Sequence, residues 1–96
     1  MNNITKIDLD QLQGSVLTLL GITDNQIQNI DLSGLTNTAL KGLYLSNNQL
    51  SNVDLGGLSN SVLRKVILSG NPICASWGNN IPTQNNKNGQ PITIIC

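Results

Sequence analysis

The segment Leu40-Lys-Gly-Leu-Tyr-Leu-Ser-Asn-Asn-Gln-Leu50 belongs to a pattern that the chain repeats every 23 residues. The same register holds Leu17-Thr-Leu-Leu-Gly-Ile-Thr-Asp-Asn25 before it and Leu63-Arg-Lys-Val-Ile-Leu-Ser-Gly-Asn71 after it. Self-similarity at a fixed period of this length indicates stacked supersecondary units, because no single unit can bury its apolar face alone.

Within each repeat, Leu43-Tyr-Leu and its equivalents alternate at the strand period of two, which predicts short strands stacked in a parallel sheet. Asn25, Asn48 and Asn71 follow the strands at one fixed position. A buried amide can donate and accept, so this column is expected to satisfy backbone groups from one unit to the next. Contact with a polar ligand is the alternative role.

A second recurring segment, Ile-Asp-Leu-x-x-Leu, is expected to return the chain along the opposite side as a short strand or a single helical turn. It contains Asp8, Asp31 and Asp54 at equivalent positions. A calcium-binding column is one interpretation, but the calcium-binding repeats of β-helices are shorter and rich in glycine. The segment therefore favours aspartates that cap the turns.

The repeated positions match the motif LxxLxLxxNxL, and the chain resembles the leucine-rich-repeat family. The motif positions are Leu17, Leu20, Ile22, Asn25, Ile27; Leu40, Leu43, Leu45, Asn48, Leu50; and Leu63, Val66, Leu68, Asn71, Ile73. The resemblance implies an α/β-type repeat solenoid that is mostly β: a right-handed coil with a short parallel sheet on the concave face and irregular, 3-10 or short-strand convex segments. Three units (4–26, 27–49, 50–72) would occupy residues 1–73, and a C-terminal cap residues 74–96.

The cap is expected to cover the apolar layer that the last repeat exposes. After Ile73 the periodicity stops in a polar stretch that contains Trp77 and ends near Ile92, Ile94 and Ile95. These four side chains are the expected cover, and a ligand anchor is the alternative role for Trp77.

The two cysteines both lie in this cap, where Asn71-Pro-Ile-Cys74 is followed by Cys96. This arrangement resembles the caps of extracellular leucine-rich-repeat receptors and inhibitors, and the resemblance implies a Cys74–Cys96 disulfide in a secreted or cell-surface protein. The chain departs from the common animal cap, which carries four cysteines, and from the Gly-x-Ile-Pro of plant-type repeats. Asn3 is a candidate glycosylation site in the sequon Asn3-Ile-Thr5.

Composition argues against several function classes. The five basic and five acidic residues cancel, which does not favour nucleic-acid binding, and no apolar run is long enough for insertion into a membrane. His and Glu are absent, so the usual acid/base repertoire is reduced to Asp, Lys, Tyr44 and the two cysteines, and no metal-ligand cluster can be assembled from two cysteines without His. We expect no enzyme activity, no cofactor and no metal.

Outward positions on the expected sheet are the candidate partner-binding residues. They are Lys41, Tyr44, Ser46, Asn47, Arg64, Lys65, Ile67 and Ser69. Apolar Tyr44 and Ile67 flanked by three cations have the composition of an interface hot spot. Such a patch suits a protein or peptide partner with an acidic or sulfated group. The alternative is an ordinary solvated surface.

The sequence thus favours a non-catalytic recognition module from a larger secreted or cell-surface protein. A purely structural capping segment and the repeat region of a receptor kinase are the rival interpretations. Only three residues precede Ile4, so we also expect an uncovered first layer. Either upstream repeats cover it in the natural protein, or the chain self-associates through the sheet edge near Leu19.

Overall fold

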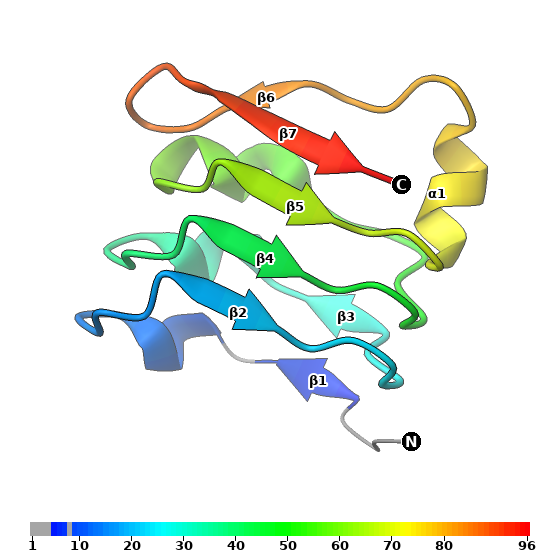
Figure 1. Ribbon diagram of the computed structural model, residues 1–96, viewed down its shortest axis with the longest axis horizontal. Coiled ribbons are helices and arrows are strands. Elements are labelled where there is room, and N and C mark those ends of the chain that lie inside the picture. Colours follow the sequence, from blue (N-terminus) through cyan, green and yellow to red (C-terminus); the bar gives the residue numbers. More distant parts are fainter. Residues whose placement is uncertain (1–4, 8) are drawn as a thin grey trace.

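The computed structural model describes residues 5–7 and 9–96, and a five-stranded sheet forms one side of it (Figure 1). The strand order is β2-β4-β5-β7-β6; the first four strands run parallel and β6 pairs antiparallel with β7. The strands are β2 (Leu19–Gly21), β4 (Gly42–Tyr44), β5 (Lys65–Ile67), β7 (Pro91–Ile95) and β6 (Gln84–Asn85). The predictions for Asn3 and Asp8 lie outside the described residues.

The strand pairing follows the 23-residue period. Leu20 pairs with Leu43, and Leu43 with Val66. Leu43 and Val66 are buried, as the alternation of apolar residues predicts. The predicted register of these three strands is therefore confirmed.

The opposite side of the molecule consists of short returning segments. The strand β1 (Lys6–Ile7) pairs parallel with β3 (Asn29–Ile30). Among the described residues, three 3-10 helices lie on this side, and η2 packs against both η1 and η3. They are η1 (Leu9–Leu12), η2 (Leu32–Leu35) and η3 (Leu55–Asn60). The apolar core between the two sides consists mostly of leucines, one layer per repeat.

The predicted aspartate caps are present on two of these helices. Asp31 precedes η2 and accepts hydrogen bonds from the Ser33 hydroxyl at 2.6 Å and the Ser33 backbone N–H at 3.0 Å. Asp54 accepts from the Gly56 N–H at 2.9 Å ahead of η3. The two bonds from Ser33 hold the pKa of the Asp31 carboxyl below its ordinary value of 3.8, because they stabilise the ionised form.

The asparagine column ties one repeat to the next. Nδ2 of Asn48 donates to the carbonyl of Leu45 at 2.9 Å and to that of Ile22 at 2.8 Å, while its Oδ1 accepts from the Ile27 N–H at 3.2 Å. Asn71 makes the equivalent three bonds one repeat later. Both side chains are buried, so the predicted role as backbone partners is confirmed for them.

The residue before each of these asparagines adopts a left-handed backbone conformation. The φ angles are 59° at Asp24, 59° at Asn47 and 78° at Gly70. Asp, Asn and Gly are the residue types that tolerate this region, which explains their recurrence at one repeat position. Asn25 is likewise buried, and its Nδ2 donates to the Thr23 carbonyl at 2.9 Å.

The C-terminal segment is more ordered than an irregular cap. An α-helix, α1 (Pro72–Trp77), begins at Pro72, where the missing N–H costs nothing at the first helical position. It leads through β6 into β7, which adds a fourth parallel strand beside β5. Trp77 and Ile94 pack partly buried against the core and Ile92 is buried in it. Ile95 differs from the expectation: it is 37% exposed because its strand position points it outward.

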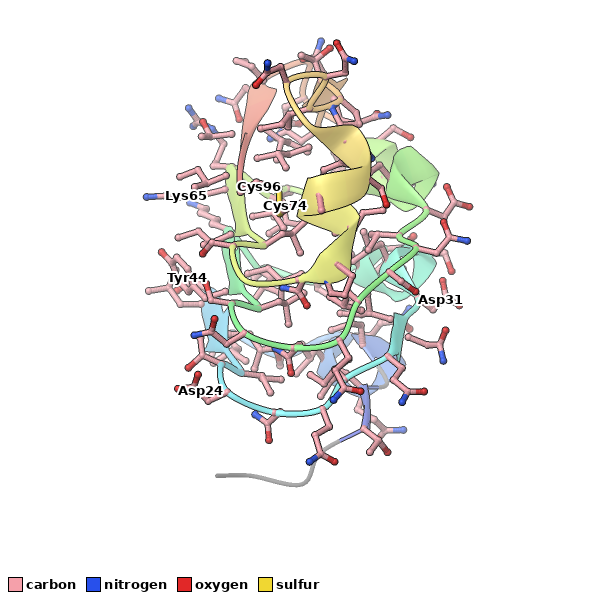
Figure 2. All side chains as sticks on the ribbon, turned by 90° about the vertical axis from the view of Figure 1, so that its right-hand side faces the viewer. Asp24, Asp31, Tyr44, Lys65, Cys74 and Cys96 are labelled. Carbon is pink, nitrogen blue, oxygen red and sulfur yellow. A yellow bond between two sulfur atoms is a disulfide. The ribbon has the colours of Figure 1, made fainter. Side chains whose placement is uncertain are left out.

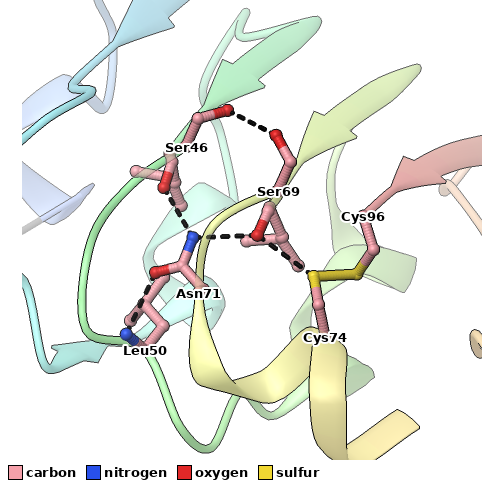
Figure 3. The surroundings of a disulfide bond; sticks show 8 residues. Ser46, Leu50, Ser69, Asn71, Cys74 and Cys96 are labelled. Carbon is pink, nitrogen blue, oxygen red and sulfur yellow. Dashed lines mark hydrogen bonds between the residues drawn. A yellow bond between two sulfur atoms is a disulfide. The ribbon is translucent and has the colours of Figure 1, made fainter. Parts of the chain in front are cut away.

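Cys74 on α1 and Cys96 at the end of β7 form a disulfide, with 5.5 Å between their Cα atoms (Figure 3). The bond joins the helix to the last strand across a sequence separation of 22. Asn71 and its partners lie beside the bond, so the last member of the asparagine column and the disulfide stabilise the same region.

Candidate partner-binding surface

An apolar row crosses the outer face of the sheet. Strand pairing aligns Tyr44 with Ile67 and Ile67 with Ile95. On β2, Gly21 aligns with Tyr44, whereas Leu19 aligns with Gly42 and so lies beside the row, two residues earlier along the strand. Tyr44 and Ile67 are half-buried, Ile95 is 37% exposed and Leu19 is 56% exposed. The predicted pair Tyr44 and Ile67 therefore lies within a longer surface that extends over four strands.

Gly42 allows two members of this row to meet. A Cβ atom on Gly42 would lie 2.6 Å from Leu19 Cδ2 and 3.2 Å from the Tyr44 hydroxyl oxygen. These side chains occupy the space above the glycine, which is why Gly42 is buried although it lies on the outward side of the strand. Leu19 was not among the predicted site residues; its outward strand position beside a glycine is the signal that would have identified it.

The three predicted cations lie along the same side of the molecule. Lys41 and Arg64 immediately precede β4 and β5, and the Arg64 N–H donates to the Lys41 carbonyl at 2.8 Å. Lys65 is exposed at the start of β5. In Figure 2, Tyr44, Lys65 and Asp24 lie on one side and Asp31 on the other. The three cations outnumber the Asp24 carboxylate on the sheet face, whereas the capping carboxylates Asp31 and Asp54 lie on the opposite side.

The remaining predicted contact residues are partly committed to bonds within the chain. The hydroxyls of Ser46 and Ser69 lie 3.0 Å apart and bond to each other. Nδ2 of Asn47 donates to the Asp24 carboxylate at 3.0 Å. These three residues lie at the strand ends beside the apolar row, where their bonds order the surface.

A hollow of about 460 Å³ lies at the opposite end of the strands, beside Lys41 and Arg64. Two residues of the cap, Asn88 and Gln90, help to line it. The sequence pattern does not identify them, because the cap has no counterpart in the repeats from which a position could be inferred.

Within residues 5–7 and 9–96, no three His, Cys, Asp or Glu side chains come together as a metal site. In the same part of the chain, no helix has the length and apolar character needed to cross a membrane.

Comparison with family models, with curated proteins and with solved structures gave no match. The candidate surface therefore rests on the chemistry and geometry of this chain.

Proposed function

We propose that the chain is a leucine-rich-repeat recognition module that binds a protein or peptide partner through the outer face of the five-stranded sheet. The observation that carries the proposal is the apolar patch of Leu19, Tyr44, Ile67 and Ile95 on that face, in which Leu19 and Ile95 are exposed and Tyr44 and Ile67 are half-buried. Tyrosine and arginine are among the residue types that most often dominate binding energy, and Tyr44 and Arg64 both belong to this side of the sheet.

The charges on this face indicate the chemistry of the partner. Lys41, Arg64 and Lys65 flank the apolar row, whereas the capping carboxylates Asp31 and Asp54 belong to the other side. Opposite charges across an interface steer encounter and fix orientation. The partner therefore carries an acidic or sulfated group beside an apolar one.

The module acts, in this proposal, as part of a larger secreted or cell-surface protein. The Cys74–Cys96 disulfide supports an oxidising compartment. Standard interfaces engage roughly 20 to 30 residues a side, more than this short sheet face offers, so further contacts outside the chain would add to the affinity.

Selection from a phage-displayed random peptide library tests the proposal. Peptides enriched on the folded chain are expected to contain acidic and aromatic residues. Their affinity should fall about tenfold or more for Tyr44→Ala, since hot-spot truncations cost at least 1 to 2 kcal/mol.

The charge contribution is tested with two triple variants. Lys41→Gln/Arg64→Gln/Lys65→Gln should lose binding, and the charge-conserving Lys41→Arg/Arg64→Lys/Lys65→Arg should keep most of it. Asn52→Ala on the opposite side serves as the neutral control. Failure to enrich any peptide would favour the purely structural capping function, and equal binding by all variants would contradict the proposed surface.

A further inference from the structure

The hollow at the start of the strands collects side chains from all three repeats and from the cap. Thr18, Lys41, Arg64 and Gln90 each directly precede a strand of the sheet: β2, β4, β5 and β7. The full lining is Thr18, Thr38, Ala39, Lys41, Val62, Arg64, Asn88 and Gln90. It contains two cations and no carboxylate.

Lys41 and Arg64 occupy neighbouring strand positions, since backbone bonds link Lys41 to Thr18 at 2.7 Å and Arg64 to Lys41 at 2.8 Å. Adjacent strands lie about 4.8 Å apart, and like charges directly opposite each other are destabilising. Within the described residues, neither side chain has a hydrogen bond or an ion pair. The repulsion is therefore uncompensated by the protein.

A buried asparagine in the cap, Asn86, orients the polar residues on the far side of the hollow. Its Oδ1 accepts from the backbone N–H groups of Asn88 at 3.0 Å and Gln90 at 3.1 Å, and its Nδ2 donates to the Leu63 carbonyl at 3.0 Å. These backbone partners determine which end of the amide is oxygen.

The orientation of Asn86 in turn determines that of Gln90. Nδ2 of Asn86 donates to Gln90 Oε1 at 3.2 Å, so the acceptor end of Gln90 is occupied and its Nε2 remains available as a donor. The Asn88 side chain and the Thr18 hydroxyl likewise have no partner within the described residues. The lining thus offers unused donors from both the sheet and the cap.

We propose that this hollow binds a tetrahedral oxyanion, a sulfate or phosphate ester group presented by the partner. The inference rests on the proposed function and adds the chemical class of the group that the partner inserts. A phosphate ester carries up to two charges and three acceptor oxygens, and a sulfate ester has the same three oxygens. Two cations and three neutral donors suit such a group better than a carboxylate, which has one charge and two oxygens.

Titration of the isotope-labelled chain with inorganic sulfate, inorganic phosphate and acetate at constant ionic strength tests the inference by NMR. Saturable shifts should be confined to amides around Thr18, Lys41, Arg64 and Gln90, including the Gln90 side chain. Either tetrahedral ion should bind about tenfold more tightly than acetate, given the stronger bonds between charged groups. Comparison of sulfotyrosine with phosphotyrosine then identifies the preferred ester.

The matched variants are Arg64→Gln and Lys65→Gln, which remove the same charge from adjacent residues, only the first of which lines the hollow. Arg64→Gln should weaken sulfate about tenfold, and Lys65→Gln less than threefold. Equal weakening by both, or equal binding of sulfate and acetate, would overturn the site. These probes need no peptide, so sulfate binding can persist even if the peptide selection fails, which distinguishes failure of the proposed function from failure of this site. Tyr44→Ala should leave the affinity for sulfate unchanged.

Discussion

The side-chain amide of Asn48 donates to the carbonyl of Ile22, 26 residues earlier, at a distance of 2.8 Å. A single buried side chain thereby joins the ends of two successive strands. Asn71 does the same to Leu45 one repeat later. A shorter or purely apolar side chain at these positions could not make this contact.

Asn48→Ala should lower the free energy of unfolding by about 1 to 3 kcal/mol, because it leaves buried backbone groups without partners. Denaturant unfolding followed by circular dichroism measures the change. Asn52→Ala, at an exposed asparagine of the following repeat, is the matched control and should change stability far less. Tyr44→Ala should also cost less than Asn48→Ala, since Tyr44 lies on the outer face. Equal losses for Asn48→Ala and the control would contradict the role assigned to the column.

The disulfide should contribute roughly 3 kcal/mol for a loop of this length in the chain-entropy model. The double variant Cys74→Ser/Cys96→Ser is therefore expected to unfold at lower denaturant concentration, and the cap should lose protection from hydrogen exchange before the repeats do. Intact-mass measurement after thiol alkylation checks the bond itself. Two alkylated thiols in protein folded under oxidising conditions would refute it and weaken the extracellular assignment.

The stability of the protein should depend on the ionisation of Asp31 at acid pH. The pKa of Asp31 is lower in the folded state than its ordinary value of 3.8. The ionised carboxylate therefore makes its full contribution to the free energy of unfolding above pH 3.8, and this contribution is lost as the pH falls from 3.8 toward the folded-state pKa. Asp31→Asn still caps η2 but carries no charge. Wild type should therefore exceed this variant in stability at neutral pH, and the difference should shrink below about pH 4. A difference independent of pH in thermal unfolding would exclude the linkage.

Strand β2 is expected to support self-association. It has β4 on one side and, among the described residues, no strand on the other. Val16 is 91% exposed and Leu19 is 56% exposed along this edge. Concentration-dependent sedimentation should reveal dimers or larger species, and Val16→Lys should reduce them by placing a charge on the edge. A monodisperse monomer at high concentration would show that the edge does not pair.

The repeated part of this fold could be predicted from the residues alone. Leu43, Tyr44 and Asn48 each occupy a repeat position that returns every 23 residues. Which of these side chains are buried and which face outward therefore follows from alternation once one strand is placed. The aspartate caps follow in the same way, because the preference of a carboxylate for the N–H groups at a helix start is local.

The cap and the hollow depended on the tertiary structure. Residues 74–96 have no internal repeat, so nothing in them indicates that β7 adds a parallel strand beside β5 or that Ile95 faces outward. Asn86 bonds to Leu63 at a sequence separation of 23, a long-range contact that no local preference encodes. The sequence determined the spacing of the repeats through side-chain periodicity, whereas only the closing of the last layer brought the donors of Asn88 and Gln90 to Lys41 and Arg64.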